Sequence, residues 1–289
     1  MNALAQAHLA DLPSASAGAG WRAELRLAYQ RRGARTVLVE RAHRGPLVVQ
    51  RPLYPEGETV CHTILVHPPA GIAGGDRLAL TLEIGAQAHV LLTTPGAGKW
   101  YRSAGAHGEL VQRIRVAEGG VCEFLPQESI VFDGALGTLA TEVELAGSAV
   151  FIGAEMLCLG RTGAGERFTR GELALRTRIS REGRPLWLER GVLEGGSAVL
   201  EAGVGLDGAP VSATLLVAAP ACDAGLLEAW RAIEPVAGRG AVSLLPGLLV
   251  ARWIGPACEP GRAWLARLWG AARLQVAGRA MQVPRIWNT

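Results

Sequence analysis

The sequence has no long hydrophobic run. Of its 289 residues 49% are hydrophobic, yet no uninterrupted apolar stretch occurs that reaches the roughly 18 residues a membrane-spanning helix needs. Residues 1–20 lack a basic start and a sustained apolar segment, and Asp11 interrupts them, so they do not resemble a secretory signal. We therefore expect a cytoplasmic protein with no membrane contact. Residues 1–20 are predicted to form a disordered tail and residues 21–289 a single domain.

Cysteine is scarce, and its spacing excludes two classes of site. The five cysteines are widely separated: Cys61, Cys122, Cys158, Cys222 and Cys258. No pair has the spacing of a zinc site, and an odd, scattered set does not indicate a disulfide framework. Reduced, mostly buried thiols in a cytosolic protein are the simplest interpretation.

Concentrated positive charge is also missing. The formal net charge is only +3, and a single lysine, Lys99, stands among 29 basic residues. The arginines occur singly, as at Arg113 and Arg115, and do not gather in one segment. Nucleic acid is therefore not an expected partner.

Alternation of apolar and polar residues is abundant. Leu78, Leu80, Leu82 and Ile84 share one face of an expected strand. Many such short strands are separated by turns, and a quasi-repeat places Gly85, Gly119 and Gly147 between successive strands. The pattern predicts a mainly β protein of stacked or coiled sheets.

Helical signals are confined to the last third of the chain. Asp223 is placed to cap a helix over residues 224–233. Pro260 is placed to begin another over residues 261–274, with Trp264 and Trp269 on its apolar face. We expect these two helices toward the C-terminus.

A loop rich in glycine follows one expected strand. His67 is followed by two prolines, then by Gly71, Gly74 and Gly75, and Asp76 closes the loop. Glycine adds nothing to a core and allows close approach to the backbone. The loop is therefore predicted to be approached by something else, with Asp76 held at its end.

Two glycine motifs imitate nucleotide-binding loops. Residues 203–208 match the dinucleotide fingerprint in letters, but Pro210 and an expected strand follow where a helix is required. Residues 95–100 hint at a phosphate loop, yet Trp100 replaces the hydroxyl residue that holds magnesium. We expect no tightly bound cofactor.

Carboxylates inside apolar segments are the strongest chemical signal. Glu128 and Asp133 lie among strand residues, and Glu155 interrupts a nearly continuous apolar strand. A buried carboxylate is costly unless it is paired or binds a cation. One interpretation is an ion pair with an arginine such as Arg161 or Arg190. The other is a water-filled path with sparse carboxylates in its wall.

Six ordered blocks of sequence then resemble one family. They are the runs 50–57, 67–76, 92–103, 125–134 with Leu125-Pro126-Gln127-Glu128, 157–161, and 185–190 with Pro185-Leu186-Trp187-Leu188-Glu189-Arg190. In order and spacing they resemble the urease accessory protein UreD family, called UreH in some organisms. The likeness extends from about residue 22 to beyond 216 and continues more weakly to the C-terminus.

That resemblance implies a non-catalytic maturation factor with a coiled β fold and two helices. Members of the family join UreF and the GTPase UreG, dock on apo-urease and deliver nickel to it. They are thought to contain an internal tunnel for the metal. The implied ligand is nickel(II) in transit, and the implied partners are UreF, UreG and apo-urease.

A conduit needs ligands that release the ion, because nickel binds nitrogen and sulfur donors tightly. Isolated oxygen ligands with water permit entry and exit. We therefore hypothesise that Asp76, Glu128, Asp133, Glu155 and Cys158 line a tunnel. A pure interaction scaffold remains the main alternative, followed by an enzyme with Glu128 and Asp133 as acid and base.

Overall fold

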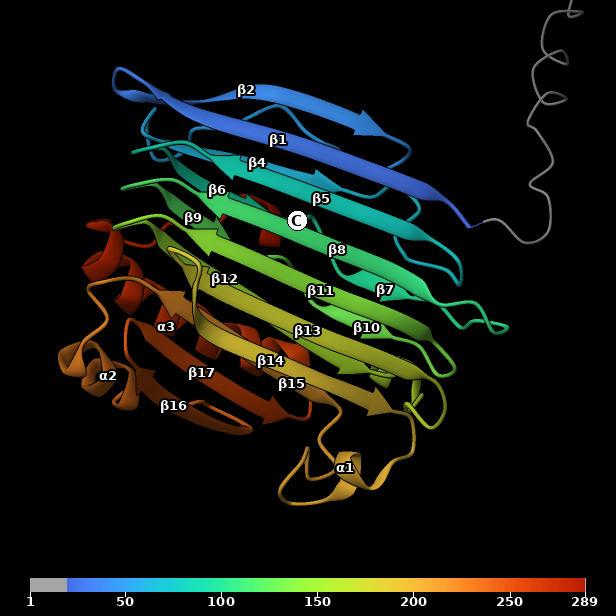
Figure 1. Ribbon diagram of the computed structural model, residues 1–289. Helices are drawn as coiled ribbons and strands as arrows, with labels where there is room; N and C mark the ends of the chain where they lie inside the picture. The colour runs from blue at the N-terminus through green and yellow to red at the C-terminus, as the bar shows by residue number, and fades with distance from the viewer. Residues whose placement is uncertain (1–19, 289) are drawn as a thin grey trace, which may run out of the picture.

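The computed structural model describes residues 20–288 of the chain. The tail predicted over residues 1–20 therefore lies outside the described residues, apart from Gly20. Across residues 20–288 the structure is mainly β, as the alternation predicts, and the chain passes repeatedly between two stacked sheets (Figure 1).

The strands and helices have the following bounds. The strands are β1 (Arg22–Arg32), β2 (Arg35–Arg44), β3 (Val48–Val49), β4 (Val60–Val66), β5 (Arg77–Ile84), β6 (His89–Thr93), β7 (Gly98–Trp100), β8 (Gly108–Val116), β9 (Val121–Phe124), β10 (Ser129–Val131), β11 (Leu136–Leu145), β12 (Val150–Leu159), β13 (Glu172–Arg181), β14 (Arg184–Glu194), β15 (Val211–Ala218), β16 (Arg239–Leu245) and β17 (Leu248–Gly255). The α-helices are α1 (Ala198–Glu201), α2 (Ala224–Arg231) and α3 (Cys258–Ala277), and two 3-10 turns cover Thr162–Ala164 and Arg285–Asn288.

Two sheets contain all of these strands. Sheet I has seven, in the order β14-β13-β11-β8-β5-β1-β2; its interior pairs are parallel and its two outer pairs antiparallel. Sheet II has ten, with the main path β16-β17-β15-β12-β9-β6-β4-β3, while β10 pairs with β12 and β7 pairs with β10. In sheet II, β4, β6, β9 and β12 are parallel, and β15, β17 and β16 continue antiparallel.

The quasi-repeat of the sequence corresponds to successive coils. The chain crosses from sheet I to sheet II between β5 and β6, β8 and β9, and β11 and β12. These crossings are the turns around Gly85, Gly119 and Gly147. Neighbouring turns stack on each other, since the Gln87 N–H donates to the Glu118 carbonyl at 3.1 Å. Each coil thereby extends both sheets by one strand.

Sheet II is covered on both faces, by sheet I on one side and by α2 and α3 on the other (Figure 1). This arrangement explains why the strands of the two sheets have different patterns of buried residues. The strands β1 and β5 alternate buried and exposed residues, whereas β6 is buried at every position and β12 at most. Along β12, the buried apolar residues with odd numbers face sheet I and those with even numbers face the helices.

Both predicted C-terminal helices are present, and the structure adds the short helix α1. The Asp223 carboxylate accepts the Leu226 N–H at 2.8 Å, so the predicted cap of α2 is confirmed. Helix α3 begins at Cys258, a few residues before the predicted start. Its buried Trp264 and Trp269 lie in the apolar cluster beside sheet II.

Packing within the chain explains glycines of the glycine loop, which corrects the expectation that packing has no need of them. A Cβ atom added to Gly74 would lie 2.2 Å from the Ser103 hydroxyl oxygen, and one added to Gly71 would lie 2.4 Å from the Tyr101 ring. Both distances are far below van der Waals contact. The glycines let the loop of residues 67–76 pack against residues 99–106, a packing role that the sequence argument excluded.

A cavity between the two sheets as the candidate functional site

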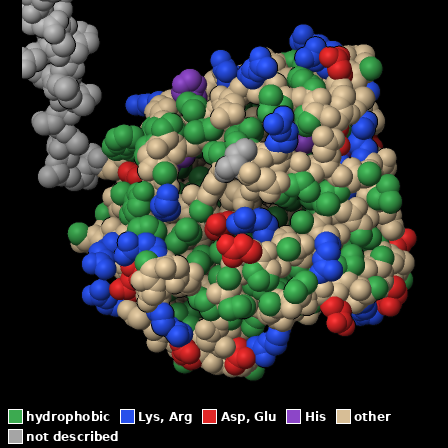
Figure 2. Space-filling view, turned by 180° about the vertical axis from the view of Figure 1, so that it is seen from behind, with side chains coloured by type: hydrophobic (Ala, Val, Ile, Leu, Met, Phe, Trp, Pro, Cys, Tyr) green, Lys and Arg blue, Asp and Glu red, His purple; other side chains and the backbone are tan. Residues whose placement is uncertain are grey.

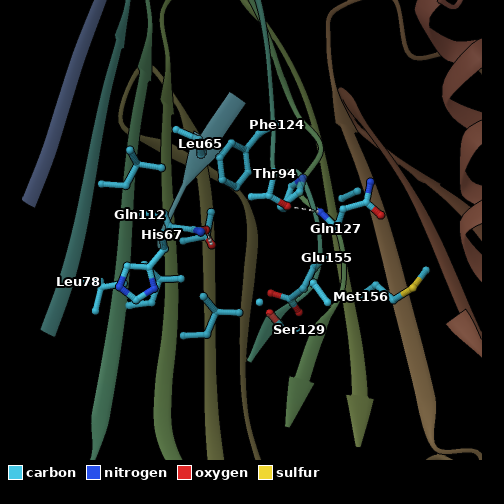
Figure 3. A pocket seen from close by; sticks show the side chains of 18 of the residues that line it. Leu65, His67, Leu78, Thr94, Gln112, Phe124, Gln127, Ser129, Glu155 and Met156 are labelled. Carbon is cyan, nitrogen blue, oxygen red and sulfur yellow. Dashed lines mark hydrogen bonds between the residues drawn. The ribbon is translucent and has the colours of Figure 1, made fainter. Parts of the chain in front are cut away.

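A cavity of about 520 Å³ lies between the sheets. Apolar side chains such as Leu65, Leu78 and Phe124 form most of its wall (Figure 3). Two loops, residues 67–72 and 94–97, border it beyond the ends of β4 and β6. At about 30 Å³ per water molecule, this volume holds an octahedral ion together with its shell of waters.

A row of polar side chains crosses the inner face of sheet I. Gln112, Thr141, Thr177 and Glu189 are direct neighbours on β8, β11, β13 and β14. Residues paired across strands project to the same face, and all four line the cavity. The Thr141 hydroxyl donates to the Gln112 side-chain oxygen at 2.9 Å. The cavity thus has an oxygen-bearing band across the strands.

A second polar row faces the first from sheet II. Glu155 on β12, Thr214 on β15 and Arg252 on β17 are direct neighbours in the register. Figure 3 shows the Glu155 side chain extending into the space between the sheets. The rows meet at one end of the cavity, where Arg252 forms an ion pair with Glu189 at 2.6 Å.

Glu155 is the unpaired carboxylate of the cavity. It makes no hydrogen bond or ion pair with another residue in the described range 20–288. Burial raises the pKa of Glu155 to about 7, the nearby Glu189 carboxylate adds to this, and Arg252 opposes it. The ion pair with Arg161 that the sequence left open is not formed, because Arg161 pairs with Glu166 at 2.5 Å.

Glu128 borders a smaller cavity beside the first. The two cavities share Pro126, Gln127, Ala154 and Met156 in their walls. The Glu128 carboxylate forms an ion pair with Arg262 of α3, and both residues line the smaller cavity. Glu128 therefore stands on the helix side of sheet II, while Glu155 stands between the sheets.

Asp76 and Asp133 border neither cavity and instead accept hydrogen bonds from loops. Asp76 accepts the N–H groups of Trp21 and Ala73, each at 2.8 Å. Burial would raise the pKa of Asp133, but hydrogen bonds from Thr169 and Arg170 outweigh it and lower that pKa to about 2. Both carboxylates fix loop geometry.

The acid–base pair considered from sequence is not assembled. Asp133 lies in the turn after β10 and is held by Thr169 and Arg170, whereas Glu128 is held by Arg262 of α3. The two carboxylates thus have different partners, and of the two only Glu128 borders a cavity.

Cys158 belongs to the helix side of sheet II. It is buried among the residues that pack under α3 and donates to the Gly160 carbonyl at 3.3 Å. The adjacent Cys258 thiol lowers the pKa of Cys158, and the pKa of Cys258 is raised in turn. Cys158 and Glu155 are three residues apart on one strand, so they face opposite sides.

A buried charge network, missed from the sequence, joins the helix layer to sheet II. Arg273 of α3 is fully buried and pairs with Glu123 at 3.0 Å and with Glu56 at 2.8 Å. His89 contacts Glu123 at 2.6 Å, and His62 contacts Glu56 at 2.7 Å. Burial disfavours the Glu56 carboxylate, but His62 and Arg273 lower its pKa to about 2. Glu123 lies inside the short strand β9, and this carboxylate between Cys122 and Phe124 was the available signal.

Donors that could contact a cation are spaced along the main cavity. His67 comes directly after β4, and Glu155 lies on β12. The two strands are three positions apart in sheet II, which separates them by roughly 14 Å. Burial lowers the pKa of His67, which leaves its imidazole neutral and able to ligate. Within residues 20–288, no group of three or more His, Cys, Asp or Glu side chains is arranged to hold a metal. The geometry favours weak, sequential contacts.

On the face of the molecule that Figure 2 shows, the charged side chains form no large patch of one sign. Acidic and basic side chains are interspersed there with apolar ones. Among the helices of the described residues, none is both long and apolar enough to cross a membrane.

Comparison with protein families matches residues 21–288 to the family described as UreD urease accessory protein. Curated relatives agree. The chain is 67% identical to a urease accessory protein UreD of Azoarcus sp. (strain BH72) over 270 residues, which cover 93% of this chain and 95% of that protein. It is 50% identical to the one from Dechloromonas aromatica (strain RCB), with 93% and 95% covered. For the one from Pseudomonas fluorescens (strain Pf-5) the identity is 48%, with 96% and 100% covered.

Proposed function

Because the chain belongs to the UreD family of urease accessory proteins, whose role is in urease maturation, we propose that it is a non-catalytic scaffold and conduit in that process. It acts in the cytoplasm with UreF and the GTPase UreG, docks on apo-urease, and passes nickel(II) through the cavity between its two sheets. Nickel is the cargo here, held only in transit.

One observation carries the proposal: Glu155 presents an unpaired carboxylate to a cavity crossed by oxygen-bearing side chains. A carboxylate enclosed between two sheets without a partner is unfavourable for folding alone, and a divalent cation supplies the missing charge. Hydroxyl, amide and carboxylate oxygens bind nickel more weakly than a closed set of imidazole and thiolate donors does. The ion therefore advances and leaves.

The other carboxylates enter the proposal differently. Glu128 is proposed as a contact on a side branch, because it borders the smaller cavity. Asp76 and Asp133 are proposed to support the loops at which they accept hydrogen bonds, and Cys158 the packing under α3.

The test is to obstruct the cavity without removing a charge. Thr141 lies in the polar row of sheet I, and Thr141→Phe places a ring in the cavity. Thr138→Phe is the matched control, because Thr138 lies on the opposite face of the same strand, three residues away. Each variant is co-expressed with urease, UreF and UreG. Urease nickel is then measured by elemental analysis, and the assembly is recovered by affinity purification.

The conduit predicts that Thr141→Phe still purifies with apo-urease while urease nickel is lost, and that Thr138→Phe loads normally. Normal nickel loading of urease with Thr141→Phe would mean that the protein acts as a scaffold alone and that nickel passes elsewhere. If Thr141→Phe does not purify with apo-urease, thermal unfolding of the isolated variant shows whether it is folded. The smaller substitution Thr141→Val then serves as the folded reference.

A further inference from the structure

The polar band ends in a charged contact at one edge of the molecule. On sheet I the last member is Glu189 of β14, and on sheet II it is Arg252 of β17. Their ion pair at 2.6 Å joins the two sheets across the end of the cavity. The Glu189 side chain is 33% exposed and that of Arg252 is 48% exposed. The pair therefore stands between the cavity and solvent.

Trp187 completes this contact from the same strand as Glu189. Its indole N–H donates to the second Glu189 carboxylate oxygen at 3.3 Å, and the Arg252 guanidinium lies 5.5 Å from the centre of its ring. Both oxygens of Glu189 are thus occupied. A carboxylate held this way is satisfied without a metal.

The charges at this end balance in two arrangements. In the structure as it stands, Arg252 neutralises Glu189, and the neighbouring Glu155 has no partner among residues 20–288. A divalent cation between Glu155 and Glu189 would neutralise both carboxylates and leave Arg252 free to turn into solvent. A guanidinium cation and a divalent cation cannot share this end without strong repulsion.

We propose that Glu189 and Arg252 form a gate at the β14–β17 end of the cavity, which opens when a divalent cation replaces Arg252 on Glu189. Glu189 is then a cation ligand together with Glu155, and Arg252 is the counter-ion of the empty state. The gate rests on the proposed conduit, whose cargo it would admit or release. An exposed ion pair is weak enough to exchange readily, as a gate requires.

The first experiment needs no nickel and no partner. Thr214 lies between Glu155 and Arg252 in the sheet II row and lines the cavity. The variant Thr214→Cys is treated with a small methanethiosulfonate reagent, and its modification is followed by peptide mass spectrometry, which separates it from the native cysteines. Arg252→Gln in the same chain is expected to raise the modification rate about fivefold, the order of effect that an exposed pair can exert. Arg190→Gln, a charge loss on the outer face of β14, is the matched control.

Equal rates in the Arg252→Gln and Arg190→Gln chains would overturn the gate. The double exchange Glu189→Arg with Arg252→Glu restores an ion pair of reversed direction and is expected to return the rate to that of the parent chain. A rate that stays high in the double exchange would also count against a gate made by this pair. Both results are independent of what the cavity conducts.

The second experiment ties the gate to the conduit. Urease is loaded in the full assembly with nickel chloride, with and without an excess of EDTA added during loading. Arg252→Gln is expected to lose a several-fold larger share of its own EDTA-free loading to EDTA than the parent chain loses, because the cavity stays open to solvent. If Thr141→Phe blocks loading while Arg252→Gln matches the parent chain in EDTA, the conduit stands and the gate is wrong. If Thr141→Phe loads normally, the conduit fails on its own.

Discussion

Replacing Glu155 by glutamine tests the desolvation of the cavity directly. The pKa of Glu155 rises from 4.5 to about 7 on folding, chiefly through burial. The folded protein therefore binds more protons than the unfolded chain between these pH values, and its free energy of unfolding falls as pH rises through that window. Above pH 7 the full cost applies. At 1.36 kcal/mol per pKa unit, it amounts to roughly 3 kcal/mol.

Glutamine at position 155 keeps the shape and cannot ionise, so it escapes this cost. We expect Glu155→Gln to exceed the free energy of unfolding of the parent protein by less than about 1 kcal/mol at pH 5 and by about 3 kcal/mol at pH 8.5. Urea unfolding followed by circular dichroism at pH 5, 7 and 8.5 measures the difference. Glu142→Gln, an exposed substitution on the outer face of sheet I, is the control. A difference that does not change with pH would refute the desolvation of Glu155.

Three further substitutions test the supports around the cavity. Asp133→Asn is expected to lower the free energy of unfolding by roughly 1–3 kcal/mol at pH 7. This difference should vanish as pH falls from about 4 to 2, because the folded pKa of Asp133 is about 2. Measuring the free energy of unfolding across this pH range checks both expectations. Arg273→Met leaves Glu123 buried without its guanidinium and should lower the free energy of unfolding by about 3–5 kcal/mol in urea. Gly74→Ala meets Ser103 and should lower the melting temperature, whereas Gly96→Ala, with open space around it, should not; calorimetry of the two alanine variants decides.

Much of the fold could be predicted, because the alternation of apolar and polar residues and the glycines at turns are local features of the sequence. The alternation at Leu78–Ile84 gave a strand, and the spacing of Gly85, Gly119 and Gly147 gave the coils. The apolar run around Glu155 indicated a strand, and the structure buries that strand on both faces. The same alternation already places Glu155 and Cys158 on opposite sides of that strand, so a common wall for both was excluded by the sequence itself.

The partners of the carboxylates could not be predicted, because they depend on distant segments. Arg252 is 63 residues from Glu189, and Arg273 is 150 residues from Glu123. Only the order of strands in the two sheets brings these pairs together. Glu189 stood in the run that resembles the family, yet nothing local distinguished it from Glu194 on the same strand.

The Arg273–Glu123 pair also bears on how the chain matures during synthesis. Translation proceeds at about 5–20 residues per second, so the guanidinium emerges roughly 8–30 seconds after the carboxylate that it neutralises. Throughout that interval Glu123 has His89 as a partner but lacks the guanidinium, and α3 has not yet covered this face of sheet II. Closure of the helix layer therefore comes late in synthesis, and a chain truncated before residue 273 lacks the guanidinium that pairs with Glu123.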